Sequence, residues 1–285
     1  MNNFQNLEIE KIILKYSKRG MNILKSYIDK EFCKKAIEEL FLCNRGTIFI
    51  ITGFVKNGFA ETDGPIGAFF LAKALKKINF NPIIITDEFC RNFFNFKENL
   101  KVIYLNNDYH LLMNEVSEIL LKYNPVSIVS IERCGRTKNN RYYNMKGEEI
   151  SKFTLPLDEL FLQCNEDVLK IGIGDGGNEI GMGNLRTIIE EKLNIIPSII
   201  EVHHLIISTT SNWGAYGLIA YMEYYTNIKL MPDYDEIYEY LEFIIELGAV
   251  DGTTGKSTKT VDGFNSKIEM EIIENLKYNL TQCSS

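Results

Sequence analysis

The sequence predicts a doubly wound α/β fold, in which helices cover both faces of a mostly parallel sheet. Two observations lead to this class: short apolar runs recur along the chain, and helical patterns lie between them. The apolar runs are continuous rather than alternating, which is typical of strands buried on both faces. Each is predicted as a strand, at residues 47–52, 82–86, 102–105, 126–131, 169–173 and 205–208. The expected architecture is therefore three-layered and Rossmann-like.

Helices are predicted ahead of the first strand and between the later ones. Residues 5–43 show two helical patterns, and the first has its apolar face on Ile9, Ile12, Ile13 and Tyr16. We interpret residues 1–44 as a helical addition to the α/β unit. Further helices are predicted at 65–78, after the strand at 82–86, and at about 108–123.

The composition is that of an ordinary globular protein. Of 285 residues, 45% are hydrophobic and 24% are charged. The net charge of −7 disfavours a nucleic-acid-binding surface, which requires a basic stripe. The N-terminus lacks the apolar core of a signal peptide, and no apolar run reaches the roughly 18 residues that cross a membrane. We therefore expect no membrane partner.

Two further features concern location and domain organisation. The six cysteines are scattered and form no CxxC pair, so we expect reduced thiols in a cytoplasmic protein. No Pro-, Ser- or Gly-rich linker and no internal repeat divides the chain. Residues 1–285 are therefore predicted to form a single domain. The oligomeric state is left open by the sequence.

Polar side chains follow five of the six predicted strands. They are Glu61 and Asp63; Thr86, Asp87 and Glu88; Glu132, Arg133 and Arg136; Asp175 and Glu179; and Ser211, Asn212 and Trp213. In an open parallel sheet, ligands bind outside the carboxyl ends of the strands. We therefore predict an active site at this edge.

The stretch Gly172–Asn184, GIGDGGNEIGMGN, contains six glycines and two carboxylates. It satisfies the GxGxxG spacing, but it follows the fifth strand rather than the first, where a dinucleotide fingerprint normally lies. Asp175 would also place a negative charge against a pyrophosphate. The carboxylates instead favour a cation, which is either a metal or a substrate ammonium group.

A second glycine motif, Gly252-Thr-Thr-Gly-Lys-Ser257, is similar to a phosphate-binding P-loop. The spacing fails, because Val250 stands where the first glycine belongs, and the motif follows a helix rather than a strand. We do not predict an NTPase, although Asp251, Thr253 and Asp262 are placed at the edge of the expected pocket.

Five segments together are recognisable: ETDGPIGA, IERCGR…YYNMKG, GDGGNEIGMG, TSNWGAYGL and GAVDGTTGK. In this order, over residues 45–265, they resemble the D-glutamate cyclase family, specifically its C-terminal cyclase-like domain. The resemblance implies conversion of D-glutamate to 5-oxo-D-proline with loss of water, a hydro-lyase reaction. Vertebrate members carry an additional hydro-lyase-like domain, and we expect this chain to be a stand-alone form.

Cyclisation of glutamate requires a base for the ammonium proton and an acid or cation at the γ-carboxylate. The candidates for these catalytic roles are Glu61, Asp63, Glu132, Asp175 and Glu179. A divalent cation, Mg²⁺ or Mn²⁺, is one option, with Glu61, Asp63, Asp175 and Glu179 as candidate ligands. The other option is that Asp175 and Glu179 bind the substrate ammonium directly. Asp175 is expected to matter most, unless it only caps the helix that follows.

The substrate is expected to be a small amino acid. Arg133 and Arg136 are predicted to bind its α-carboxylate. The other candidates for substrate binding are Gly176, Gly177, Asn178, Ser211, Asn212 and Trp213, with core packing as the alternative for the tryptophan. Two alternative functions stay open: a metal-dependent hydrolase or dehydratase of another small amino or hydroxy acid, and an amino-acid-binding protein without catalysis.

Overall fold

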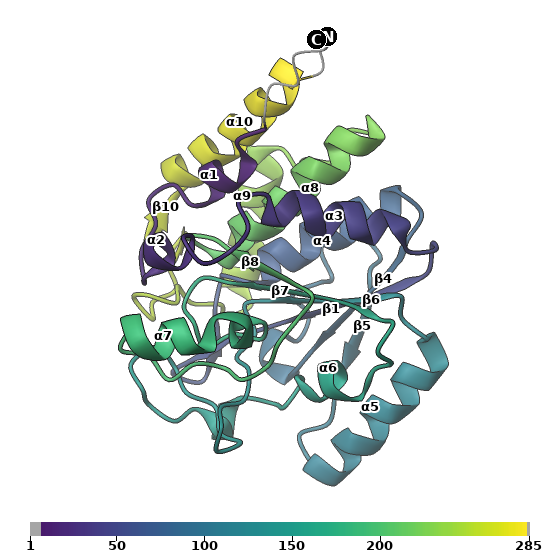
Figure 1. The fold of residues 1–285 in the computed structure, drawn as a ribbon, viewed down its shortest axis with the longest axis vertical. Helices are drawn as coiled ribbons and strands as arrows, with labels where there is room; N and C mark the ends of the chain where they lie inside the picture. Colours follow the sequence, from purple (N-terminus) through teal and green to yellow (C-terminus); the bar gives the residue numbers. More distant parts are fainter. Residues whose placement is uncertain (1–6, 284–285) are drawn as a thin grey trace.

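A six-stranded parallel sheet forms the centre of the computed structural model, which describes residues 7–283 (Figure 1). The spatial order of the strands is β5-β4-β1-β6-β7-β8, and every neighbouring pair is parallel. The strands are β1 (Thr47–Thr52), β4 (Asn81–Thr86), β5 (Lys101–Tyr104), β6 (Ser127–Ile131), β7 (Leu169–Gly174) and β8 (His204–Ile207). The predicted fold class is confirmed.

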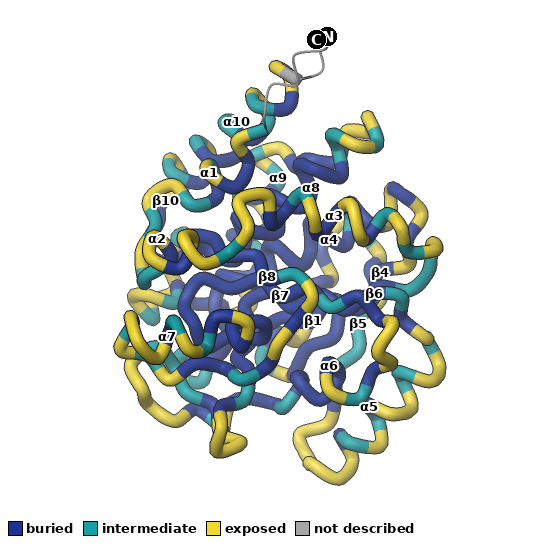
Figure 2. The backbone as a smooth tube through the Cα atoms, in the orientation of Figure 1, coloured by how far each residue is buried: buried dark blue, intermediate teal, exposed yellow. Residues whose placement is uncertain are grey.

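Helices lie on both faces of this sheet (Figure 1). One face is covered by α3 (Phe32–Leu42), α4 (Pro65–Lys77) and α8 (Ser211–Thr226), and the other by α5 (Tyr109–Tyr123), α6 (Glu159–Gln163) and α7 (Arg186–Lys192). Helix α8 is buried over most of its length, because α3 and α4 flank it while α1 (Ile9–Ile13) and α10 (Ser266–Cys283) pack on it from outside (Figure 2). An amphipathic pattern is therefore absent from α8, as expected for a helix surrounded by protein.

The strand order creates a switch point between β1 and β6. The chain proceeds outward from β1 through β4 to β5, and then from β6 through β7 to β8 on the opposite side. The loops that follow β1 and β6 therefore leave the sheet towards opposite sides. Ligands bind at such a switch point in open α/β sheets.

The N-terminal segment forms three short helices where two were predicted: α1, α2 (Met21–Leu24) and α3. Ile9 and Ile13 are buried as expected, but α1 ends at Ile13 and the exposed Tyr16 lies outside it. Tyr16 and Arg19 have left-handed backbone angles, with φ of 63° and 53°. Residues 14–20 consequently leave the helical path and form turns.

The helix predicted after the second strand was wrong. Only the short 3₁₀ turn η1 (Glu88–Cys90) follows β4. Asn92 has a φ of 68°, which stops a helix, and the next two residues, Phe93 and Phe94, are both buried. The turns at residues 91–94 instead place both aromatic rings in the main hydrophobic core.

Smaller elements complete the chain. Two antiparallel hairpins pair β2 (Val55–Lys56) with β3 (Phe59–Ala60), and β9 (Thr260–Val261) with β10 (Phe264–Asn265). The remaining elements are η2 (Ser151–Phe153), η3 (Met182–Leu185) and α9 (Tyr234–Glu246). Within residues 7–283, no helix is long and apolar enough to cross a membrane. The five cysteines whose side chains are described, Cys33, Cys43, Cys90, Cys134 and Cys164, are free thiols.

Candidate active site

Asp63 lies between β3 and α4, on the connection that follows β1. Its carboxylate accepts hydrogen bonds from the backbone N–H groups of Ser211 and Asn212, each at 2.8 Å. These are the first two residues of α8, so the carboxylate faces the positive end of that helix dipole. This arrangement fixes Asp63 at the carboxyl edge of the sheet.

Glu132 is the first residue after β6, across the switch point from Asp63. Its backbone is left-handed, with a φ of 47°, which is uncommon for a non-glycine residue. The Ser211 hydroxyl donates a 2.5 Å hydrogen bond to Glu132 Oε2. Strained backbone of this kind recurs at functional sites, where it aims a side chain.

Asp175 is the first residue after β7. Its Oδ2 is ion-paired with Arg19, and its buried Oδ1 accepts no hydrogen bond from the described residues. The next helical elements in the described part of the chain, η3 and α7, are preceded by Gly181 and Leu185, and neither has a side-chain cap. The role of helix cap, which was the alternative for Asp175, is therefore not seen.

Two further carboxylates, Glu61 and Asp262, complete what we call the acidic cluster. Both flank Gly252, where an added Cβ would lie 2.5 Å from Glu61 Oε2 and 2.8 Å from Asp262 Oδ1. Asp262 occupies the turn between β9 and β10 and is also ion-paired with Arg19. The acidic cluster is therefore Glu61, Asp63, Glu132, Asp175 and Asp262, all of them buried.

Within the acidic cluster, Asp63, Glu132 and Asp175 are arranged as metal ligands are. One carboxylate oxygen of each lies within 4.8 Å of the others. Three hard oxygen donors at such separations suit Mg²⁺ or Mn²⁺. The sequence named Asp63 and Asp175 as candidate ligands, but Glu132 takes the third place rather than Glu61 or Glu179.

Burial makes the acidic cluster electrostatically costly. It raises the pKa of Glu61 to about 8, with Asp262 adding to the effect, and that of Asp63 to about 8. Burial also raises the pKa of Glu132 and of Asp175 well above the ordinary carboxyl range, against the opposing effect of Arg19. Carboxyl groups with raised pKa values are either protonated or stabilised in the ionised form by a bound cation.

Arg19 is the basic residue that sequence reasoning missed. Within residues 7–283, it is the one basic side chain that is ion-paired with the acidic cluster, through Asp175 and Asp262. It comes from the turns between α1 and α2, which are 156 residues from Asp175 in the chain. No local motif marks it, and only the tertiary structure could have found it.

Glu179 is bound by the glycine-rich loop itself. Its carboxylate accepts hydrogen bonds from the backbone N–H groups of Asp175, Gly176 and Gly177, at 2.7–3.2 Å. A Cβ at Gly176 would lie 2.8 Å from Glu179 Oε1, and Gly177 has a φ of 112°. These glycines therefore accommodate an internal carboxylate, and their amides do not point to a ligand. Asn178 is likewise engaged, because its amide donates to the Tyr143 carbonyl.

The two arginines predicted to bind the substrate have other partners. Arg133 is buried, and its guanidinium group donates to Asp87 and to the carbonyls of Gly53 and Leu155. Arg136 is ion-paired with Asp158 and Glu159. Both side chains tie loops together at the sheet edge, and neither is ion-paired with the acidic cluster.

The residues predicted at the start of α8 divide into two groups. Ser211 contacts the acidic cluster through Asp63 and Glu132, as described above. Asn212 accepts from the backbone N–H groups of Gly64 and Gly67 and so fixes the start of α4. Trp213 is fully buried, and its Nε1 donates to Glu269 at 2.6 Å, which agrees with core packing.

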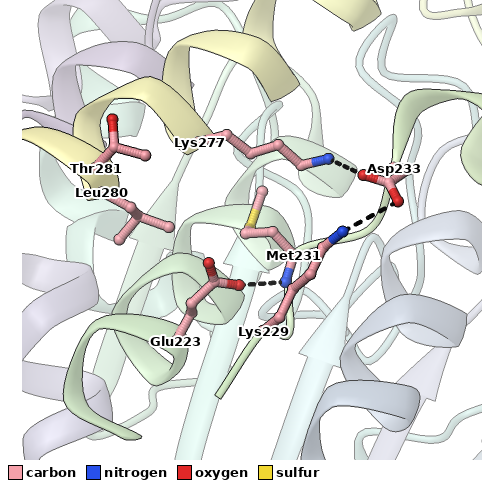
Figure 3. A pocket seen from close by; sticks show the side chains of 7 residues that line it. All are labelled: Glu223, Lys229, Met231, Asp233, Lys277, Leu280 and Thr281. Atoms are coloured by element: carbon pink, nitrogen blue, oxygen red, sulfur yellow. Dashed lines mark hydrogen bonds and ion pairs between the residues drawn. The ribbon is translucent and has the colours of Figure 1, made fainter. Parts of the chain in front are cut away.

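A pocket of about 420 Å³ lies elsewhere, beside α8 and α10 (Figure 3). Lys229 and Lys277 both pair with Asp233 there, and Glu223 accepts from the Met231 backbone. The carboxylates of this pocket are thus satisfied by neighbours. The acidic cluster, with its unpaired oxygens, is the better candidate site.

The architecture and the site define a three-layer α/β protein with buried carboxylates at the switch point of its sheet. The chain belongs to the family described as "D-glutamate cyclase-like, C-terminal", whose model matches residues 9–277. This match includes α1–α3, which sequence reasoning had set apart as an addition, and it contains Arg19.

A relative is also found among curated proteins. The human protein named "D-glutamate cyclase, mitochondrial" is 29% identical to this chain over 207 residues. The aligned part is 63% of this chain and 33% of the human protein, so the chain spans about a third of that relative. The family resemblance drawn from the five sequence segments is confirmed.

Proposed function

We propose that this protein is a D-glutamate cyclase, a hydro-lyase that converts D-glutamate to 5-oxo-D-proline and water. The observation that carries the proposal is the triad Asp63, Glu132 and Asp175, whose carboxylate oxygens converge at the switch point of the sheet. Membership of the D-glutamate cyclase-like family and the name of the human relative support the choice of substrate.

We further propose that the triad holds a divalent cation. The donors are all carboxylate oxygens, which Mg²⁺ and Mn²⁺ prefer, and Asp175 Oδ1 is buried without a hydrogen-bond partner among the described residues. Fully ionised, the five carboxylates of the acidic cluster outnumber Arg19 by four charges. A divalent cation would offset half of this excess and, when bound, would polarise the γ-carboxylate of the substrate.

The overall reaction forms one bond and breaks one. The α-nitrogen bonds to the γ-carboxyl carbon, and one oxygen leaves that carbon as water. The substrate ammonium group loses two protons, and the leaving oxygen gains both, so charge and atoms balance. A group that accepts a proton from nitrogen and returns it to oxygen would serve both halves of the reaction.

Glu61 and Asp63 are suited to this proton transfer. Burial raises the pKa of each to about 8, so that both proton-bound and proton-free forms are accessible near neutral pH. Asp63 is held rigidly by the N-terminus of α8, whereas Glu61 shares its surroundings with Asp262. We assign the proton transfer to Glu61, because Asp63 is required as a ligand.

The substrate class and the location are proposed from the burial of the site, the composition and the cysteines. A small amino acid is consistent with a compact buried site, and the net charge of −7 does not suggest a nucleic-acid partner. We propose a cytoplasmic location from the scattered free cysteines, whereas the human relative is named as mitochondrial.

The proposal is tested with purified protein and D-glutamate. Product is separated by chiral chromatography after incubation with Mg²⁺, with Mn²⁺ or with EDTA, and L-glutamate serves as the matched control. We expect 5-oxo-D-proline from D-glutamate in the presence of metal and loss of turnover in EDTA. Tight binding of D-glutamate without product would instead favour an amino-acid-binding protein.

A further inference from the structure

Arg19 covers the acidic cluster from the solvent side. Its guanidinium group contacts Asp175 and Asp262, which are almost fully buried, while 25% of the Arg19 side chain is exposed. The same group also approaches the carbonyl of Thr209, at 3.5 Å, in the loop after β8. Arg19 therefore lies between the solvent and the carboxylates that a ligand must reach.

The backbone of the turns that carry Arg19 is hydrogen-bonded to Thr209 at their first half, while in their second half Lys18 lies over the Phe264 ring and Gly20 packs against Leu193. The carbonyls of Ile13 and Lys15 accept from the backbone N–H and the hydroxyl of Thr209, at 2.9 and 2.8 Å. Arg19 itself has a left-handed backbone and is followed by Gly20, with a φ of 86°. A change of backbone angles at this Arg-Gly pair would withdraw the guanidinium group without disturbing α1.

Arg19 and a divalent cation would occupy the two oxygens of one carboxylate, because Arg19 pairs with Asp175 Oδ2 and Oδ1 has no partner among the described residues. The Asp175 Oδ2 atom already accepts from Arg19, and Asp175 is one of the three carboxylates that converge. Two positive groups at one buried carboxylate repel each other strongly, because the surroundings screen them poorly. Each is therefore expected to weaken the binding of the other.

We infer that Arg19 is a displaceable occupant of the cation site, which leaves Asp175 when the metal binds and then binds a carboxylate of the substrate. This inference rests on the proposed function. A substrate with two carboxylates enters a site rich in acids, so it requires a basic partner. Arg133 and Arg136 are bound to acids of their own, whereas Arg19 is partly exposed and has the planar geometry that binds a carboxylate with two hydrogen bonds.

The alternative is that Arg19 is a permanent counter-ion of the acidic cluster. The two roles predict opposite effects of removing it. A displaceable occupant competes with the metal, so its removal tightens metal binding. A permanent counter-ion stabilises the arrangement of ligands, so its removal weakens metal binding or leaves it unchanged.

The experiment compares Arg19→Gln with Lys15→Gln, a control in the same turns whose ammonium group pairs with the exposed Glu271. Mn²⁺ is titrated calorimetrically into each protein in the absence of D-glutamate. We expect Arg19→Gln to bind Mn²⁺ about tenfold more tightly than the parent, since a charge-assisted contact no longer competes. Lys15→Gln should stay within about threefold of the parent.

Two further readouts complete the test. With saturating Mn²⁺, the KM for D-glutamate should rise about tenfold or more in Arg19→Gln, because the carboxylate partner is gone. In the parent, Mn²⁺ should speed amide hydrogen exchange in residues 14–20, and this measurement does not depend on the folding of any variant.

Unchanged or weaker Mn²⁺ binding by Arg19→Gln, or added protection of residues 14–20, would overturn the inference. If the Mn²⁺ affinities split as expected but no protein forms product, the displacement is upheld and the D-glutamate assignment fails.

Discussion

Two sets of buried charges lie at the carboxyl edge of the same sheet, and they differ in balance. Arg133 and Arg136 pair with Asp87, Asp158 and Glu159, so this set, called the balanced set below, carries an excess of only one negative charge. The acidic cluster places five carboxylates around Arg19 alone, and two of their oxygens have no hydrogen-bond partner among the described residues. The balanced set holds loops together through its ion pairs. In the acidic cluster, the buried carboxylates repel one another, and a bound cation would reduce this repulsion.

The largest expected effect comes from the acidic cluster. Asp175→Asn keeps the shape of the side chain but removes a charge from the proposed ligand triad. Turnover of D-glutamate should fall about 10³-fold, equivalent to roughly 4 kcal/mol, while the free energy of unfolding changes by less than about 1 kcal/mol. Steady-state kinetics and urea unfolding on the same preparation measure both. Turnover within about threefold of the parent would remove Asp175 from the site.

The matched change in the balanced set is Asp158→Asn. Asp158 is fully buried and accepts from the backbone and guanidinium groups of Arg136 and from the Tyr142 hydroxyl. Loss of its charge should lower the free energy of unfolding by about 2 kcal/mol, because the charge-assisted hydrogen bonds of a buried carboxylate are weakened and Arg136 keeps only Glu159 as a charged partner. The folded fraction should keep its turnover. If Asp158→Asn were stable but inactive, the balanced set would have a direct role in the reaction, and the contrast with the acidic cluster would be wrong.

Substitution of Glu179 tests whether this residue is a metal ligand or only stabilises the glycine-rich loop. We predict that Glu179→Gln lowers the free energy of unfolding by about 2 kcal/mol, because one amide oxygen cannot replace a carboxylate that accepts three backbone N–H groups. Mn²⁺ affinity should stay within about threefold of the parent, since Glu179 is not in the triad. A tenfold loss of Mn²⁺ affinity with unchanged stability would instead restore Glu179 as a ligand.

A further predicted effect is a dependence of thermal stability on pH. Unfolded carboxyl groups titrate near pH 4, whereas Glu61 and Asp63 titrate at about 8 in the folded protein. Between these values the folded state holds extra protons, so without metal the stability falls as the pH rises towards 8.

Divalent cations should act in the opposite direction. Because carboxylates must lose their protons to bind Mg²⁺, the rise in Tm that Mg²⁺ produces should be larger at pH 8 than at pH 6, by a few degrees. Thermal unfolding with and without Mg²⁺ at the two pH values measures the difference. A rise in Tm that is equal at both would show that Mg²⁺ binds outside the acidic cluster.

Much of the fold was predictable because its signals are local. The six apolar runs lie within one residue of the observed strands at both ends, and the turn chemistry at Gly64-Pro65 marks the start of α4. The helix predicted after β4 failed because its aromatic residues contact the core through turns, a tertiary effect that periodicity does not contain.

The site was predictable only in part. Asp63, Glu132 and Asp175 each directly follow or closely follow a strand, and the topology of a parallel sheet brings such residues together. Arg133 and Arg136 also lie at the edge, but their partners, such as Asp158, are distant in sequence and cannot be paired by spacing. Arg19 comes from a turn with no distinguishing motif, so its contact with Asp175 emerges only from the folded chain.

The most direct test of the central claim is the position of a bound cation. Crystals grown with Mn²⁺ would be measured near the manganese absorption edge, and the anomalous difference map would locate the ion. We predict one strong peak bound by Asp63, Glu132 and Asp175, with the Arg19 guanidinium group withdrawn from Asp175. An acidic cluster without a peak, still closed by Arg19 at saturating Mn²⁺, would contradict the account.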